Sequence, residues 1–158
     1  MIKQVFAFFK GFKYATNGIF IAVKQERNLR FDIVFAILVY FFSSFYNFSS
    51  VEYILITLFV AGIFSLELVN SAIERAVAKP DENHYNFAGA AKDIAAGAVL
   101  IFAIASGIVG VILFWDKAVL FNIFNFFTQK IWALGLLVLF LIVSFLFVFR
   151  NEDNSIGK

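Results

Sequence analysis

Cysteine is absent from this 158-residue sequence, and histidine and proline each occur once. Without cysteine the chain forms no disulfide bond and no thiolate metal site, and a single histidine excludes a histidine-rich metal centre. Charged residues are scarce as well, at 15% of the chain compared with about 25% in an ordinary globular domain. The net charge is only +2, and no basic patch has interleaved aromatic residues, so nucleic acid is not an expected partner.

Apolar residues are abundant, at 62% of the chain, and they include 24 phenylalanines. They form long uncharged runs and do not alternate with polar positions, a pattern typical of integral membrane proteins. The sequence therefore predicts an all-α membrane protein with four spanning helices, the first of them short for a hydrocarbon core of about 30 Å. The expected spans are residues 31 to 45 or 48, 51–77, 91 or 92 to 115, and 131–149, and a serine cap is expected in the turn at 46–50.

Residues 1–23 predict an amphipathic helix on the membrane surface. Lysines at positions 3, 10 and 13 interrupt the segment, which is therefore not expected to be a cleaved signal peptide. Aromatic and aliphatic residues recur at spacings of three and four, as in a helix that lies in the headgroup plane. A charged hinge is expected at residues 24–30, and polar segments are expected at 79–86 and 150–158.

The distribution of basic residues predicts the orientation in the membrane. Six of the thirteen Lys and Arg residues precede the first span, and the loop after the second span is flanked by Arg75, Lys79 and Lys92. Because positive charge is enriched on the cytoplasmic side, both segments are expected there. We therefore expect a multi-pass membrane protein with these segments in the cytoplasm, where ATP is available.

Four polar residues near the end of the second span share one helix face. Glu67, Asn70, Ser71 and Glu74 have the spacing i, i+3, i+4 and i+7, which places their side chains on one stripe about two turns long. A carboxylate at membrane depth costs roughly 2.5 to 3.5 kcal/mol and usually faces a protein interior where it has a function. The alternative is that both glutamates are interfacial residues paired with Arg75 and Lys79.

The predicted topology brings three acidic clusters to the cytoplasmic interface. Carboxylates suit Mg²⁺, which usually takes one or two of them together with substrate phosphates. Neither a GxxxxGK loop nor a kinase-type glycine loop with an HRD segment is present, so carboxylates and a metal ion would have to position the phosphates. The clusters are Glu26 with Asp32, Glu67 with Glu74, and Asp93 beside Lys92, where Lys92 is placed to neutralise a phosphate and Glu67 to act as a general base.

Two paired motifs identify a family resemblance. ELVNSAIE at 67–74, followed by AAKDIAAGAV at 90–99, resembles the signature of the prokaryotic diacylglycerol kinase family, which also includes undecaprenol kinases. FKYATNG at 12–18 and KQERNLR at 24–30 are similar to that family's N-terminal helix and hinge. The resemblance covers about residues 5–115 and implies a small homotrimeric membrane kinase with a surface helix and three spans per subunit.

The resemblance also implies roles for individual residues. Glu67 matches the catalytic base of the family, and Glu26 and Glu74 match the residues that hold the metal of MgATP. Lys92 and Asp93 match nucleotide contacts, and Lys10, Tyr14 and Asn70 match further nucleotide or active-site positions. The sequence departs from the family at Ala78, where many members have Asp, at His84-Tyr85, where some have the reverse order, and at the fourth span, 131–149.

The expected function is therefore transfer of the γ-phosphoryl group of MgATP to a lipid alcohol, first of all diacylglycerol, with undecaprenol as the alternative acceptor. A non-enzymatic membrane protein or ion pathway is the alternative of another class, and a pore does not require the Lys92-Asp93 pair. Residues 1–117 are expected to form the kinase-like membrane domain and 118–158 an added helix and tail. All the assigned site residues lie at or before Asp93, so the fourth span is expected to be dispensable for the chemistry.

Overall fold

The computed structural model describes residues 2–78 and 85–150, and within these ranges every regular element is a helix. This confirms the all-α prediction. A single residue, Glu26, separates the first two helices. The helices are α1 (Ile2–Gln25), α2 (Arg27–Ser43), α3 (Ser50–Ala76), α4 (Tyr85–Phe114), α5 (Lys117–Gln129) and α6 (Ile131–Val148).

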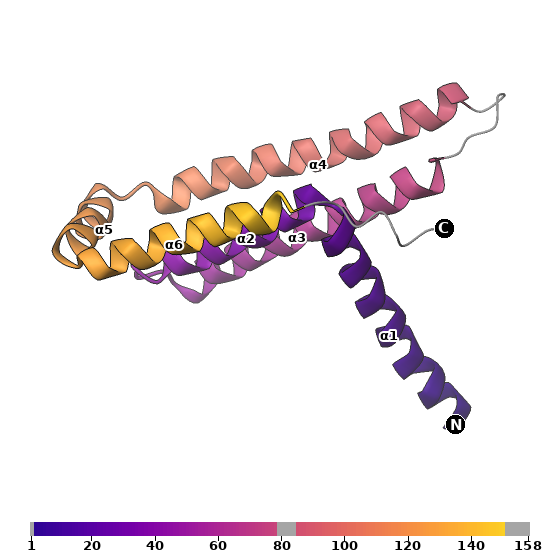
Figure 1. The fold of residues 1–158 in the computed structure, drawn as a ribbon, viewed down its shortest axis with the longest axis horizontal. Helices are drawn as coiled ribbons and strands as arrows, with labels where there is room; N and C mark the ends of the chain where they lie inside the picture. Colours follow the sequence, from indigo (N-terminus) through magenta and orange to yellow (C-terminus); the bar gives the residue numbers. More distant parts are fainter. Residues whose placement is uncertain (1, 79–84, 151–158) are drawn as a thin grey trace.

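Three of these helices, α3, α4 and α6, are long and apolar enough to cross a membrane. α2 has 17 residues and is about 26 Å long at 1.5 Å per residue, slightly less than the hydrocarbon core of about 30 Å. A first span shorter than the hydrocarbon core was predicted from the sequence. α2 lies alongside α3 and α6 and packs against both of them (Figure 1).

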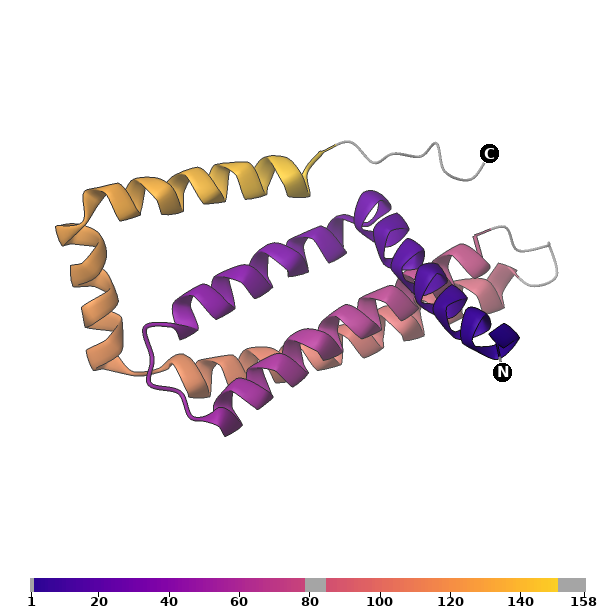
Figure 2. The ribbon, with the colours of Figure 1, turned by 90° about the horizontal axis from the view of Figure 1, so that it is seen from below.

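The long axes of α2, α3, α4 and α6 run roughly parallel, and α4 packs mainly on α3 (Figures 1 and 2). α5 crosses one end of this bundle and joins α4 to α6. Toward the opposite end, the break between α1 and α2 lies alongside α3, and the end of α3 and the beginning of α4 extend past this break (Figures 1 and 2). The fold thus gathers the ends of several helices around the acidic residues.

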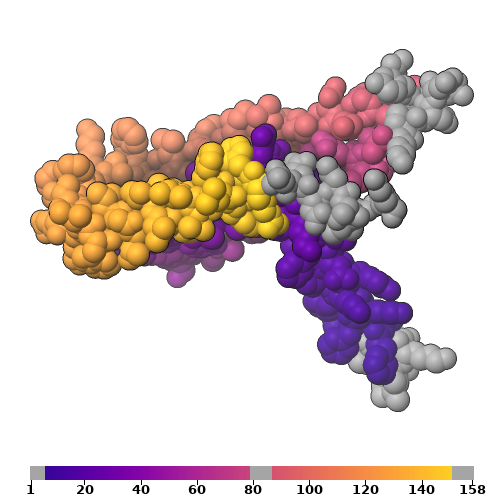
Figure 3. All heavy atoms as spheres, viewed as in Figure 1, coloured from indigo at the N-terminus to yellow at the C-terminus, as the bar shows by residue number. Residues whose placement is uncertain are grey.

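α1 leaves the bundle at a steep angle and protrudes from its body (Figure 3). Its aromatic side chains remain exposed, with Phe6 at 71% and Phe12 at 60% of their full accessible surface. Of the residues in α1, Ala22 near its end is buried. An apolar helix of this kind that does not pack on its own chain suits the predicted position in the headgroup plane.

Two helix boundaries differ from the prediction. α4 begins at Tyr85 and not at residue 91 or 92, because the helix continues through a polar segment that apolar periodicity alone cannot detect. The predicted charged hinge is almost entirely helical, and its break is confined to Glu26, whose backbone is extended at φ −103° and ψ 116°. Of the polar segments predicted at 79–86 and 150–158, residues 79–84 and 151–158, including Lys79 and His84, lie outside the described residues, whereas Tyr85 and Asn86 belong to α4.

Two helices of this chain approach each other closely at one glycine of α3. A Cβ atom at Gly62 of α3 would overlap the ring of Phe102 in α4, so it is this glycine that lets the two helices meet. A Cβ added at any of the α4 glycines would meet no atom of this chain within 4 Å. The reason is that α4 turns a different face, which includes the buried Ala88 and Ala95, toward the bundle; the open glycines are Gly89, Gly97, Gly107 and Gly110.

The start of α3 has a complete capping box, which confirms the serine cap expected in the preceding turn. The Ser49 hydroxyl accepts a hydrogen bond from the Glu52 backbone N–H, and the Glu52 carboxylate accepts one from the Ser49 backbone N–H at 2.6 Å. This arrangement satisfies two of the four N–H groups that a helix start leaves without a partner. The cap therefore fixes where the second span begins.

We expect Ser49→Ala to lower the free energy of unfolding by about 1 kcal/mol, because the first turn of α3 loses its side-chain acceptor. Ser50→Ala is the matched control, since Ser50 lies next to the cap and is exposed. SDS-induced unfolding in mixed micelles measures both variants. Equal midpoints for the two would show that the capping box does not stabilise this helix.

Candidate functional site

The stripe on α3 faces the protein interior, as its spacing predicted. Glu67 is 8% exposed and Ser71 is 4% exposed, whereas Asn70 and Glu74 are half-buried at the edge of the same face. The four residues lie in the last turns of α3, which ends at Ala76. α3 therefore carries one buried carboxylate at depth and a second one closer to the helix end.

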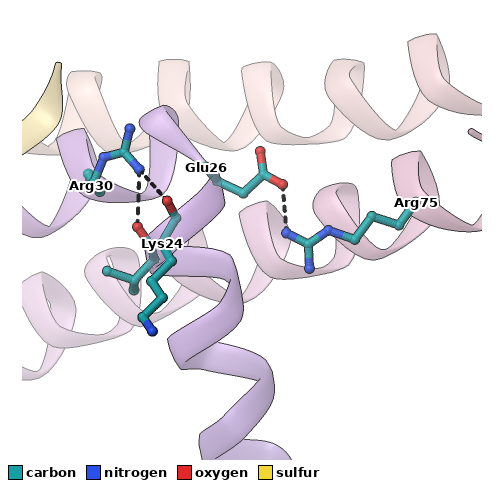
Figure 4. A network of polar contacts seen from close by, with 5 residues as sticks. Lys24, Glu26, Arg30 and Arg75 are labelled. Carbon is teal, nitrogen blue, oxygen red and sulfur yellow. Dashed lines mark hydrogen bonds and ion pairs between the residues drawn. The ribbon is translucent and has the colours of Figure 1, made fainter. Parts of the chain in front are cut away.

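The break between α1 and α2 places Glu26 opposite the end of α3. Nη2 of Arg75 lies 2.8 Å from Oε1 of Glu26, so the residue between two helices forms an ion pair with a third helix (Figure 4). The alternative reading, in which Arg75 neutralises Glu67 or Glu74, is wrong. Neither of these glutamates forms an ion pair with any described residue.

Asp32, in the second turn of α2, belongs to the same cluster. The charge of Glu67 acts on Asp32, and the charges of Glu26 and Glu74 act on Glu67. The structure thus brings the four carboxylates of two predicted acidic clusters within electrostatic range of one another. Burying like charges together is costly unless cations or protons compensate them, so the group is suited to a cationic ligand.

Two oxygen atoms in this cluster are buried without a hydrogen-bond partner in the described part of the chain, namely Oδ2 of Asp32 and Oδ1 of Asn70. An unsatisfied buried acceptor costs about 1 to 3 kcal/mol. Such acceptors are rare in folded proteins and mark positions where a proton donor or a cation is accommodated. Asp32 was grouped with Glu26 from the sequence but was assigned no role; the signal available was a carboxylate directly before the apolar run of α2.

The donor set fits a magnesium ion that also binds phosphates. Within the described ranges no group of three or more His, Cys, Asp or Glu residues forms a ready-made metal cage. Mg²⁺ does not need one, because it commonly takes one or two carboxylates and fills its other positions with phosphate oxygens and water. Glu26 and Glu74, which lie at the outer edge of the cluster, are the residues that could supply two such carboxylates.

The structure does not bring Lys92 and Asp93 into contact with this cluster. Both side chains are exposed on α4. The face of α4 that packs on the bundle contains Ala88 and Ala95, and Asp93, two residues from Ala95, points to the opposite side of the helix. Within one chain, the predicted nucleotide contacts of α4 and the carboxylates of α3 are therefore separate.

Lys10 and Tyr14 are also separate from the cluster. They lie on the exposed part of α1, and Tyr14 is 63% exposed. Counted along the helix at 1.5 Å per residue, Tyr14 is about 18 Å and Lys10 about 24 Å from Glu26. Ala78, where many members of the family have Asp, is exposed just beyond the end of α3 and forms no part of the cluster.

Chemically, the arrangement provides a buried proton acceptor, Glu67, and two less buried carboxylates, Glu26 and Glu74. Glu67 lies about two turns before Glu74 along α3, and Glu26 and Glu74 lie nearer the helix ends. An acceptor hydroxyl beside Glu67 and a metal-bound polyphosphate beside Glu26 and Glu74 would be adjacent. This geometry suits proton removal from an alcohol coupled to transfer of a phosphoryl group.

Comparison with known proteins agrees with this chemistry. The profile of the family described as "Prokaryotic diacylglycerol kinase" matches residues 13–114. The chain is 42% identical to a protein named "Undecaprenol kinase" from Bacillus subtilis over 110 residues, which cover 70% of this chain and 89% of the relative. It is 33% identical to a "Diacylglycerol kinase" from Haemophilus influenzae over 104 residues, 65% of this chain and 88% of the relative.

A "Diacylglycerol kinase" from Synechocystis is 34% identical over 100 residues, which cover 63% of this chain and 57% of that relative. No solved structure matches the chain at a significant level. The family match ends at the last residue of α4, so α5 and α6 lie outside it.

Proposed function

Since this chain belongs to the prokaryotic diacylglycerol kinase family and is a multi-pass membrane lipid kinase, we propose that it transfers the γ-phosphoryl group of ATP to the hydroxyl group of a lipid alcohol. The observation that carries the proposal is the buried Glu67, which is within electrostatic range of the carboxylates of Glu26, Asp32 and Glu74. Family membership favours this reading over the ion pathway that the intramembrane acids alone would also have allowed.

In the proposed reaction Glu67 accepts the proton of the lipid hydroxyl. The hydroxyl oxygen forms a bond to the γ-phosphorus, the bond from that phosphorus to the β,γ-bridging oxygen breaks, and ADP leaves with the bridging oxygen. Asn70, one turn from Glu67, is placed to orient a polar group of a substrate. When bound, Mg²⁺ supplies positive charge that offsets the phosphates, and Glu26 and Glu74 are the residues that would hold it.

Two acceptor lipids are supported by the names of the relatives. Diacylglycerol, which would give phosphatidic acid, is the acceptor expected from the sequence, and two of the similar proteins are named for it. Undecaprenol is the second candidate, because the relative with 42% identity is named for it. Both lipids present a hydroxyl group at the membrane surface and an apolar body to the bilayer, as the site on α3 requires.

The proposed assembly is a homotrimer in the bacterial inner membrane with its active site on the cytoplasmic side. The break at Glu26, the end of α3 and the beginning of α4 lie toward one end of the bundle, and the basic residues near them support a cytoplasmic position. The open glycine positions of α4 support close contact with a helix from another subunit. Light scattering coupled to size-exclusion chromatography measures the mass of the assembly.

An ATP-consumption assay on the purified protein in mixed micelles tests the function. Diacylglycerol and undecaprenol are offered separately, and micelles without an acceptor lipid are the control. We expect ADP to form only when an acceptor is present, and the faster substrate identifies the lipid. ADP formation at the same rate without any acceptor would contradict the assignment as a lipid kinase.

A further inference from the structure

Arg30, in the first turn of α2, is 1% exposed, and the hydrogen bonds that define its position go to backbone carbonyls at the ends of two other helices. Its Nη1 donates to the carbonyls of Val23 at 3.2 Å and Lys24 at 2.9 Å, both in the last turn of α1 (Figure 4). Its Nε and Nη2 donate to the carbonyl of Val148 at 3.1 and 3.0 Å, and Nη2 also to that of Arg150 at 3.5 Å. One guanidinium therefore joins the end of α1, the start of α2 and the end of α6.

The carbonyls that Arg30 contacts are the acceptors that helices leave unsatisfied. The last four C=O groups of a helix have no partner within it, and the helix dipole places partial negative charge there. A guanidinium has a rigid, planar set of donors and can satisfy two such ends at once, which the single ammonium group of lysine cannot do in the same geometry. Arg27 adds a weaker contact to the same region, with its guanidinium 5.8 Å from the centre of the Phe149 ring.

The junction of the end of α1, the start of α2 and the end of α6 affects the site directly, because Glu26 lies within it. Glu26 is the single residue between α1 and α2, and Arg30 binds the helix on one side of that break while belonging to the helix on the other. The direction in which Glu26 points therefore depends on the angle that Arg30 maintains between α1 and α2. In the structure this angle allows Glu26 to reach Arg75 on α3.

We propose that Arg30 is a positioning residue and that the end of α6 serves as its anchor: together they fix the angle between α1 and α2 and so hold Glu26 at the acidic cluster. α6 lies outside the residues that match the family, so this anchor is a feature added to the family fold. α6 contributes no reacting group, and its effect is on the position of Glu26.

The absence of cysteine allows a direct measurement of this angle in the full chain. Spin labels are attached at Gly11→Cys in α1, where a Cβ meets no atom within 4 Å, and at Ser44→Cys, exposed at the end of α2. Labelled chains are diluted with unlabelled chains, so that electron–electron resonance reports distances within one chain.

Two substitutions disturb the junction from opposite sides. Arg30→Lys keeps the charge and loses the planar donors; Val148→Phe places a larger side chain at a position that is 4% exposed and pushes the end of α6 away from Arg30. The matched controls are Asn28→Gln, an exposed residue in the same turn of α2, and Leu146→Phe, which is 64% exposed on α6.

We expect each junction variant to broaden the distribution of spin-label distances. The variant with both substitutions should have a distribution no broader than that of the more affected single variant, because both substitutions act on one contact. The control variants should keep the narrow distribution. A narrow distribution in Arg30→Lys would overturn the positioning role. A narrow distribution in Val148→Phe beside a broad one in Arg30→Lys would overturn the part assigned to α6.

The kinetic test rests on the proposed function. Arg30→Lys and Val148→Phe are expected to raise KM for MgATP roughly 3- to 10-fold and to leave kcat at saturating MgATP within about twofold, because Glu26 is displaced while Glu67 is not. A fall in kcat with unchanged KM would contradict positioning through Glu26. If the unaltered protein phosphorylates no lipid, the proposed function fails, while the spin-label distances still decide the role of Arg30.

Discussion

Glu67→Gln is expected to lower the rate of lipid phosphorylation by about 10² to 10⁴ while MgATP still binds and the protein remains folded. The amide of glutamine has the shape of the carboxylate but cannot accept the proton of the lipid hydroxyl. Glu67 is buried at 8% exposure and has like-charged neighbours, so replacing its charge is not expected to destabilise the helix bundle. Turnover with diacylglycerol and undecaprenol, measured per folded molecule, checks the expectation.

Glu52→Gln is the matched control for this substitution. Glu52 lies at the other end of α3, fifteen residues and about 22 Å from Glu67, and a glutamine there can still accept a hydrogen bond in the capping box. It should retain full activity. If Glu67→Gln kept more than about half of the turnover of the unaltered protein, Glu67 would not be the base.

Glu26→Gln and Glu74→Gln are each expected to weaken binding of MgATP roughly tenfold or more, because each removes a charged oxygen ligand from one shared ion. Their combined effect should be smaller than the product of the two single effects, since the second substitution acts on a site that the first has already damaged. Titration with MgATP, monitored by calorimetry, measures all three variants.

Glu26 also forms a structural contact, and the same titration distinguishes the loss of this contact from the loss of a metal ligand. It forms the ion pair with Arg75, so Glu26→Gln also removes a contact between the α1–α2 break and α3, whereas Glu74→Gln removes none. Arg75→Gln is therefore included as a control for the lost ion pair, and it should weaken MgATP binding less than Glu26→Gln does. Strictly independent effects of Glu26→Gln and Glu74→Gln would show that the two glutamates belong to different sites.

Local spacing was sufficient to predict five of the six described helices and one face of the site, whereas α5 was not predicted as a helix. The positions of Glu67, Asn70, Ser71 and Glu74 follow the helical repeat, and a repeat fixes which residues share a face regardless of the tertiary fold. The serine cap of α3 was predictable for the same reason, because capping depends on residues within one turn. Apolar runs likewise gave the spanning helices to within a few residues, except at the start of α4.

The contacts between helices were not predictable from spacing. Arg75 was considered as a partner of its neighbours Glu67 and Glu74, yet it binds Glu26, 49 residues away in sequence. Which face of α4 meets α3 depends on the packing of Ala88 and Ala95, and this rotation leaves Asp93 on the far side of the helix. Arg30 gave no local signal beyond a charge before an apolar run, because its acceptors are backbone carbonyls, two of them at the end of α1 and the others 118 and 120 residues away.

Transfer of label from ATP, labelled at the γ-phosphoryl group, into an extracted lipid is the most direct measurement of the central claim. The unaltered protein and Glu67→Gln are incubated in parallel with MgATP and one acceptor lipid in mixed micelles. We expect labelled phosphorylated lipid with the unaltered protein and an amount about 10²- to 10⁴-fold lower with Glu67→Gln. Label released as inorganic phosphate with none in the lipid, or equal labelling of the lipid by both proteins, would contradict the central claim.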